Sequence, residues 1–170
     1  MISVIMPYKH NIEFFDRLKI SICSLREQNR SDIEIIVSEV GESPIKALPE
    51  GIQYVFTYRK DKFNPALARN IGAKRATNKI LYFSDVDILL INPNYFNQIV
   101  NTINEKTQVL CKPIMRRLFV SEFQEFNTLI KLEGYRNAVN KLDLSKEYLV
   151  TLDNSTKIII YQKNSQEIFL

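Results

Sequence analysis

Short apolar segments alternate along this chain with segments whose apolar residues recur at helical spacing. Continuous apolar runs of this length are typical of strands that are buried on both faces of a largely parallel sheet. Strands that alternate with helices predict an α/β fold with a doubly wound, mostly parallel sheet flanked by helices. The predicted strands are Ile2–Met6, Ile33–Glu39, Gln53–Arg59, Ile80–Ser84, Val109–Ile114 and Lys157–Tyr161.

Helical patterns fill the intervals between these strands. Two Asn-Pro pairs, Asn64-Pro65 and Asn92-Pro93, each predict an N-cap followed by proline at the first helical position. A later helix is expected to begin with a capping box at Ser121–Gln124 and to be interrupted or bent near Gly134. The first helix is predicted by five apolar residues at helical spacing, Ile12, Phe15, Leu18, Ile22 and Leu25.

Composition places the chain among ordinary globular domains. Its 170 residues are 45% hydrophobic and 25% charged, which is enough to bury the core of one α/β domain, so a single domain over residues 1–170 is predicted. The formal charge of +4 comes from lysines and arginines scattered along the chain. This distribution is consistent with an anionic ligand, and it lacks the concentrated basic stripe of a nucleic-acid-binding protein.

Two further features indicate where such a chain would work. Cys23 and Cys111 lie far apart, without metal-ligand spacing, so reduced thiols are expected rather than a zinc site or a disulfide framework. The chain opens on a strand-like segment without a basic and apolar leader, and no stretch approaches the roughly 20 apolar residues of a membrane span. We therefore expect a cytoplasmic protein without a membrane span.

A pair of carboxylates follows one of the predicted strands. Asp85 and Asp87 come directly after Leu81-Tyr82-Phe83-Ser84, and an extended backbone would place both carboxylates on the same side. Oxygen ligands suit Mg²⁺ or Mn²⁺, which keep open positions for phosphates. Asp-x-Asp alone is weak evidence, because two acids just past a strand more often belong to a turn or a helix cap.

Four ordered segments resemble the nucleotide-sugar-binding half of the family 2 glycosyltransferases, which have the GT-A (Rossmann-like) fold. The resemblance covers roughly residues 1–115, and the segment Phe63–Ala73 followed by Asp85-Val86-Asp87 is particularly similar to polysaccharide-synthesising members. The four segments are Ser3–Tyr8 as the opening strand ending in proline, Glu34–Glu39 as the second strand ending in an acid, Ala68-Arg69-Asn70-Ile71-Gly72 as the Ala-Arg-Asn-x-Gly helix, and Ser84–Asp87 as the Asp-x-Asp strand end.

The resemblance implies nucleotide-binding roles at the ends of the first two strands. Pro7 donates no backbone hydrogen bond, so it is expected to end the strand ladder and to expose Tyr8, Lys9 and His10 as a lip for the base. Tyr8 is equally compatible with simple packing at a strand end, and His10 is given no role. Glu39, where the family usually has aspartate, would accept hydrogen bonds from a base or ribose, and otherwise is a solvated turn acid.

The resemblance also implies how the diphosphate and the metal are held. Arg69 lies in the first or second turn of the helix after Asn64-Pro65, where its guanidinium would face the diphosphate unless it makes only a surface salt bridge. Asp87 would coordinate Mg²⁺ or Mn²⁺ on the diphosphate, and Asp85 would contact the ribose and support the metal. The nucleotide-binding set is therefore Pro7, Tyr8, Glu39, Arg69 and Asp85, and the metal set is Asp87 and Asp85.

Sugar transfer with inversion, which the family implies, also needs a general base for the acceptor hydroxyl. In the family this base lies C-terminal to the matched region, commonly after a Gly-Gly-Phe-Asp-like segment, and no such segment occurs here. The chain is thus expected to lack a full C-terminal acceptor region. The available acids, none of which has a context that singles it out, are Glu133, Asp143, Glu147 and Asp153.

Three functions follow in order of preference. The first is a metal-dependent glycosyltransferase that uses a nucleoside-diphosphate sugar, most commonly a UDP-sugar in this family, and a glycan or other hydroxyl acceptor, as in polysaccharide biosynthesis. The second is a truncated or non-catalytic half that binds the nucleotide sugar without a general base. The third is a nucleotidyltransferase of related fold, which the absence of glycine from Pro7–Asn11 disfavours.

Overall fold

The computed structural model describes residues 1–45, 47–105, 115–117, 120–142, 149–153, 156–159 and 167–169. The chain forms two compact units, of which the first comprises Met1–Ile22 and Arg30–Asp87 and the second comprises Cys23–Asn29 and Ile88–Leu170. Helix α1 (Ile12–Arg26) runs from the first unit into the second. That residues 1–170 make one nucleotide-sugar-binding domain stays a prediction.

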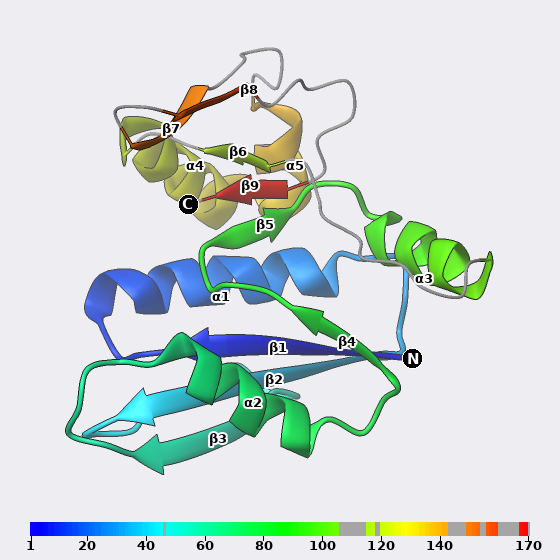
Figure 1. Ribbon diagram of the computed structural model, residues 1–170. Helices are drawn as coiled ribbons and strands as arrows, with labels where there is room; N and C mark the ends of the chain where they lie inside the picture. Colours follow the sequence, from blue (N-terminus) through cyan, green and yellow to red (C-terminus); the bar gives the residue numbers. More distant parts are fainter. Residues whose placement is uncertain are drawn as a thin grey trace. The chain divides into compact units, whose positions relative to one another are not determined.

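The first unit is built on a four-stranded parallel sheet (Figure 1). Its order is β3-β2-β1-β4, so the first strand of the chain pairs with neighbours on both sides. The predicted α/β class, with a mostly parallel sheet accompanied by helices, is confirmed. The strands are β1 (Ile2–Tyr8), β2 (Ile33–Gly41), β3 (Gln53–Tyr58) and β4 (Ile80–Phe83).

Burial separates the two inner strands from the two outer ones. Every residue of β1 is buried, and β2 is buried over most of its length, as the apolar runs predict. The prediction of burial on both faces is wrong for β3 and β4, where Tyr58, Leu81 and Phe83 are exposed. Strand order explains the difference, because β3 and β4 are the edges of this sheet and their faces are less completely covered.

Helix α2 (Pro65–Arg75) packs against β1 and β2. Its predicted start is confirmed, because the side chain of Asn64 accepts a hydrogen bond from the N–H of Leu67 at 3.0 Å and Pro65 occupies the first turn. A Cβ atom at Gly72 would lie 2.5 Å from Cγ2 of Ile5. Only glycine therefore permits this close approach between the helix and β1.

Within the described residues, the second unit contains short strands, three helices of its own and the C-terminal end of α1 (Figure 1). One sheet has β9 (Glu167–Phe169) at its centre, paired antiparallel with β5 (Ile88–Leu90) and parallel with β6 (Met115–Arg117). A separate sheet pairs β7 (Leu149–Asp153) antiparallel with β8 (Thr156–Ile159). The predicted strand Val109–Ile114 lies outside the described residues, and β8 accounts for part of Lys157–Tyr161. The elements are β5 (Ile88–Leu90), α3 (Tyr95–Glu105), β6 (Met115–Arg117), α4 (Val120–Glu133), α5 (Tyr135–Asn140), β7 (Leu149–Asp153), β8 (Thr156–Ile159) and β9 (Glu167–Phe169).

Hydrogen bonds join the elements of the second unit around Leu90. The hydroxyl of Tyr135 donates to the carbonyl of Leu90 at 3.0 Å, and the N–H of Leu90 donates to the hydroxyl of Ser24 at 3.2 Å. Burial raises the pKa of Tyr135 above its ordinary value. The phenol therefore stays a neutral donor inside this core. Among the described residues, no helix combines the length and apolar character required to cross a membrane.

Two predicted helix starts in the second unit are displaced. Helix α3 begins at Tyr95, and the side chain of Asn92 accepts from the N–H of Asn94 at 2.8 Å, so Asn92-Pro93 forms a turn before the helix instead of capping it. Helix α4 already includes Ser121, which therefore cannot be its N-cap. The interruption near Gly134 is confirmed, since this residue has φ +84° and separates α4 from α5.

Candidate functional site

Strand β1 passes through Pro7 and ends beside β2, with Pro7 opposite Ser38 and Tyr8 opposite Glu39. The prediction that Pro7 ends the ladder is wrong. The carbonyl of Ile5 accepts a hydrogen bond from the N–H of Ser84 at 3.1 Å, so the backbone polar groups of Ile5 point toward β4. Residues two apart in a strand point their backbone groups the same way, so those of Pro7 also face the β4 side. Because β4 has ended at that level, the missing N–H of Pro7 removes no bond between strands.

Tyr8 is buried rather than exposed as a lip. Its relative exposure is 1%, while Lys9 and His10 after it are exposed. The Tyr8 hydroxyl donates to the carbonyl of Asn11 at 3.3 Å, and burial raises the pKa of Tyr8 above its ordinary value. Packing at the strand end, the alternative weighed for Tyr8, describes its side chain, and its predicted contact with a nucleotide stays a prediction.

Glu39 ends in a buried polar cluster with Tyr54 of β3 and the backbone of Ile45. Its Oε2 atom accepts hydrogen bonds from the Tyr54 hydroxyl and from the N–H of Ile45, the latter at 3.0 Å. Its Oε1 atom is buried and has no hydrogen-bond partner among the described residues. Glu39 is therefore not a solvated turn acid. Burial, followed by the hydrogen bond to Glu39, raises the pKa of Tyr54 above its ordinary value.

Arg69 and Asp85 form an ion pair within the first unit. The Nη2 atom of Arg69, in the second turn of α2, lies 2.5 Å from Oδ1 of Asp85, which follows β4. Their side chains are 33% and 45% exposed, so solvent reaches both groups. The structure thus brings together two of the predicted site residues from motifs that are separated in the sequence. The small buried residues of α2, Ala68 and Gly72, let the helix lie close to the sheet.

The two carboxylates of Asp85 and Asp87 do not continue a strand. Strand β4 ends at Phe83, and Val86 and Asp87 lie in a turn. The expectation that the backbone stays extended through Asp85 and Asp87 is therefore wrong. No group of three or more His, Cys, Asp or Glu side chains that could hold a metal occurs within the described residues. A Mg²⁺ site commonly uses only one or two protein carboxylates and is completed by phosphates and water. Asp87 and Asp85 fit that smaller donor set.

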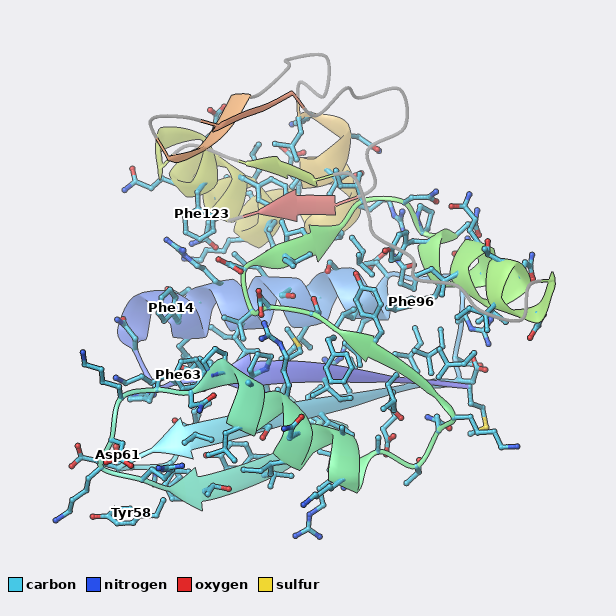
Figure 2. The ribbon with its side chains drawn as sticks, in the orientation of Figure 1. Phe14, Tyr58, Asp61, Phe63, Phe96 and Phe123 are labelled. Atoms are coloured by element: carbon cyan, nitrogen blue, oxygen red, sulfur yellow. The ribbon has the colours of Figure 1, made fainter. Side chains whose placement is uncertain are left out.

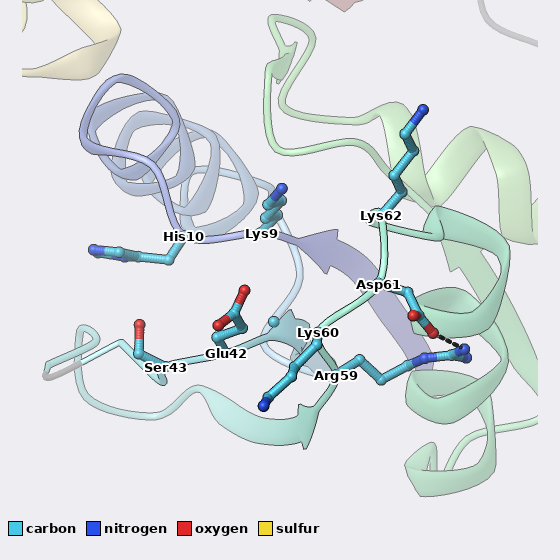
Figure 3. Close-up of a pocket in the computed structure, with 9 residues that line it drawn as sticks. Lys9, His10, Glu42, Ser43, Arg59, Lys60, Asp61 and Lys62 are labelled. Atoms are coloured by element: carbon cyan, nitrogen blue, oxygen red, sulfur yellow. Dashed lines mark hydrogen bonds and ion pairs between the residues drawn. The ribbon is translucent and has the colours of Figure 1, made fainter.

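A pocket of about 360 Å³ opens at the carboxyl ends of β1, β2 and β3 (Figure 3). Lys9 and His10 come from the loop after β1, and the loop after β3 begins next to the exposed Tyr58 (Figure 2). None of the six predicted site residues lines this pocket. The signal that sequence reasoning missed is the charged run between β3 and α2. The lining residues are Lys9, His10, Gly41, Glu42, Ser43, Arg59, Lys60, Asp61 and Lys62.

A comparison with models of protein families shows to which family this chain belongs. The model described as Glycosyl transferase family 2 matches residues 3–165. The chain belongs to this family. The match confirms the resemblance inferred from the four sequence segments, and it extends well past residue 115, where that resemblance ended. It includes most of the second unit, for which the sequence offered no family motif.

Solved structures of S. aureus TarS are similar to this chain at low sequence identity. The structure of TarS 1-349 has 15% identity and a TM-score of 0.48, and the match covers 66% of this chain and 39% of that one. TarS 1-349 in complex with UDP has 17% identity and a TM-score of 0.48, with 66% and 38% covered. Family 2 membership rests on the family model alone, and this chain spans well under half of the TarS chains. A search of curated proteins found no match.

Proposed function

We propose that this family 2 protein transfers a sugar from a nucleoside-diphosphate sugar, with UDP as the nucleotide, to a hydroxyl group of a glycan or other saccharide acceptor. The family match over residues 3–165 is the observation that carries the proposal. The Arg69–Asp85 pair supports it, because two motif residues meet at the end of β4. Inversion at the anomeric carbon and a role in polysaccharide biosynthesis are parts of the proposal taken from the family.

The proposed donor site divides its work among residues of the first unit. Arg69 offers a planar guanidinium for phosphate oxygens or a base edge, and Asp85 holds its orientation through the ion pair. Glu39 has one buried carboxylate oxygen, Oε1, without a partner in the described structure, and a donor group of the base or ribose would satisfy it. Pro7 and Tyr8 form the adjoining strand end.

Asp87 and Asp85 would hold Mg²⁺ or Mn²⁺ in this proposal. The metal would offset negative charge on the departing nucleoside diphosphate. The donor set of one or two carboxylates is typical of Mg²⁺ sites completed by substrate phosphates. The cytoplasm is the proposed compartment, where the exposed free thiol of Cys23 stays reduced.

Metal-dependent binding of nucleoside diphosphates tests the donor site. Calorimetry with UDP should give binding that EDTA weakens, and Asp87→Ala should reduce the metal-assisted affinity by about tenfold or more, on the order of 1.4 kcal/mol. Asp16→Asn is the control, because Asp16 pairs with Lys19 on the surface of α1. Equal UDP affinity with and without metal, in both the wild type and Asp87→Ala, would contradict the metal site.

A second function is that this chain binds the nucleotide sugar without transferring it efficiently. The observation that favours it is the lack, in the given sequence, of a Gly-Gly-Phe-Asp-like segment that would supply the general base. Among the candidate acids, Glu133 already forms an ion pair with Lys141, 2.5 Å from its Nζ. No general base is identified, and of the other candidate acids Asp143 and Glu147 lie outside the described residues. Donor hydrolysis and transfer to a panel of sugar acceptors should be compared. Transfer at about 1 s⁻¹ or faster would exclude this second function.

A further inference from the structure

The pocket at the ends of β1, β2 and β3 has an excess of positive charge. Four basic side chains line it, namely Lys9, Arg59, Lys60 and Lys62, against two acidic ones. Asp61 is already engaged by Arg59, since its Oδ2 lies 2.6 Å from Nη2 of the guanidinium (Figure 3).

The three lysines of this pocket have no anionic partner among the described residues. Lys9, Lys60 and Lys62 are exposed and form no ion pair with any described group. Of the lining acids, only Glu42 remains to oppose them. Like charges on one pocket repel each other unless an anion lies between them. The balance of three unpaired ammonium groups and one carboxylate therefore favours an anionic ligand.

The construction of the pocket fits a small ligand rather than a polymer groove. Its volume of about 360 Å³ is within the range of small-molecule sites. The N–H of Arg59 donates to the carbonyl of Gly41 at 2.8 Å, which ties the loop after β3 to the end of β2. The lysine heads need not point to one spot in the absence of a ligand, because flexible stems let them gather around an anion.

We propose that this pocket binds a phosphate group, and that this phosphate is not the donor diphosphate assigned to Arg69, Asp85 and Asp87, none of which lines the pocket. Lysine ammonium groups bind phosphate as point charges, and the hydroxyl of Ser43 supplies a further hydrogen-bond donor. The phosphate comes either as the free ion or as an ester on an acceptor. This site requires no metal, and it does not depend on the proposed transferase activity.

The test uses phosphate compounds in the presence of EDTA, so that metal-bound phosphate does not contribute. Inorganic phosphate, glycerol phosphate and a bis-glycerol phosphodiester should be titrated into the full chain and followed by calorimetry. The first two compounds distinguish free phosphate from a monoester, and the third represents an internal diester of a polymer. At least one of the three should bind, and added salt should weaken the binding because these charges are exposed.

Two double variants with the same change in net charge separate the pocket from the overall charge. Lys60→Gln with Lys62→Gln should weaken phosphate binding about tenfold, whereas Lys74→Gln with Lys79→Gln, at exposed positions outside the pocket, should change it less than about twofold. All four side chains are exposed, so both variants should keep the wild-type unfolding temperature.

Three results would overturn the proposal. The first is that none of the three compounds binds, and the second is that both double variants weaken binding equally, as a general charge effect would. The third is that UDP with Mn²⁺ displaces the phosphate compound, or that Asp87→Ala abolishes its binding, since the pocket would then belong to the donor site. Loss of metal-dependent UDP binding alone would count against the proposed function and leave the phosphate site intact.

Discussion

Replacing Gly72 by alanine should destabilise the protein, although alanine is the better helix former. The new Cβ would lie 2.5 Å from Cγ2 of Ile5 and 3.4 Å from Cβ of Ser38, whereas carbon atoms in contact are separated by about 3.5–4.0 Å. Ile5 and Ser38 are fully buried in the two inner strands, so neither can move aside into solvent. Helix α2 must therefore shift by about 1 Å, a distance that follows from the difference between these separations.

The magnitude follows from two opposing effects. Overpacking a buried contact costs about 1–3 kcal/mol, and this contact is against two fully buried side chains, which places it at about 2–3 kcal/mol. Alanine in place of glycine in a helix returns about 1 kcal/mol. The net loss of about 1–2 kcal/mol should lower the unfolding temperature by about 2–8 °C for a chain of this length.

Thermal unfolding followed by circular dichroism measures this effect, with Asn70→Ala as the matched control. Asn70 lies on the exposed side of the same helix, so its replacement should raise stability by roughly 0.5 kcal/mol through helix propensity alone. If Gly72→Ala also raised the unfolding temperature, α2 would not approach β1 as closely as described. The explanation of the Ala-Arg-Asn-x-Gly segment as a packing motif would then be wrong.

Three further predictions concern charged and polar contacts of the first unit. Arg69→Lys should weaken UDP binding about fivefold or more while the unfolding temperature holds, because lysine keeps the charge but loses the planar fork; a collapse in thermal stability with unchanged UDP binding would show that the pair with Asp85 is only structural. Tyr54→Phe should lower the free energy of unfolding by about 1–3 kcal/mol, because the buried carboxylate of Glu39 loses a hydrogen bond; an unchanged unfolding temperature would contradict this role. The Arg30 guanidinium, with the N-terminal ammonium, holds the pKa of the Asp32 carboxyl well below its ordinary value. The ionised Asp32 therefore stabilises the fold above the unfolded pKa of about 3.9, and this stabilisation is lost as pH falls through the lower folded pKa. The stability advantage of wild type over Asp32→Asn should accordingly be constant near neutral pH and shrink below about pH 4, and an advantage that grows on acidification would refute this assignment.

Local signals in the sequence predicted most of the first unit. The Asn64-Pro65 start of α2 succeeded because its evidence is contained within one helical turn. The same signal at Asn92-Pro93 failed, because the Asn92 side chain satisfies the N–H of Asn94 in a turn and the helix begins later. The exposure of β3 and β4 could not be predicted from their apolar runs, since it depends on which strands lie at the edges of the sheet.

The sequence motifs could name candidate site residues, but they could not predict the contacts and burial that those residues acquire in the folded protein. The motifs named Arg69 and Asp85 as site residues, and the structure brings them together in a part-exposed ion pair, which is the alternative weighed for Arg69, while their contact with a nucleotide stays a prediction. The burial of Glu39 depends on Tyr54, which lies on another strand, and the residues next to Glu39 in the sequence do not predict that contact. The pocket was not predicted, because the site residues were chosen from the four family segments and the charged run Arg59–Lys62 belongs to none of them.

The order of strands β3-β2-β1-β4 has a consequence for synthesis on the ribosome. Strand β1 emerges first, yet it needs both β2 and the much later β4 as neighbours. At about 5–20 residues per second, some 4–16 s separate the synthesis of β1 from that of β4. Throughout that interval a mostly apolar strand, which is wholly buried in the folded protein, has one edge without its eventual partner. Nascent chains that end before residue 80 should therefore be targets for chaperones that recognise extended apolar segments.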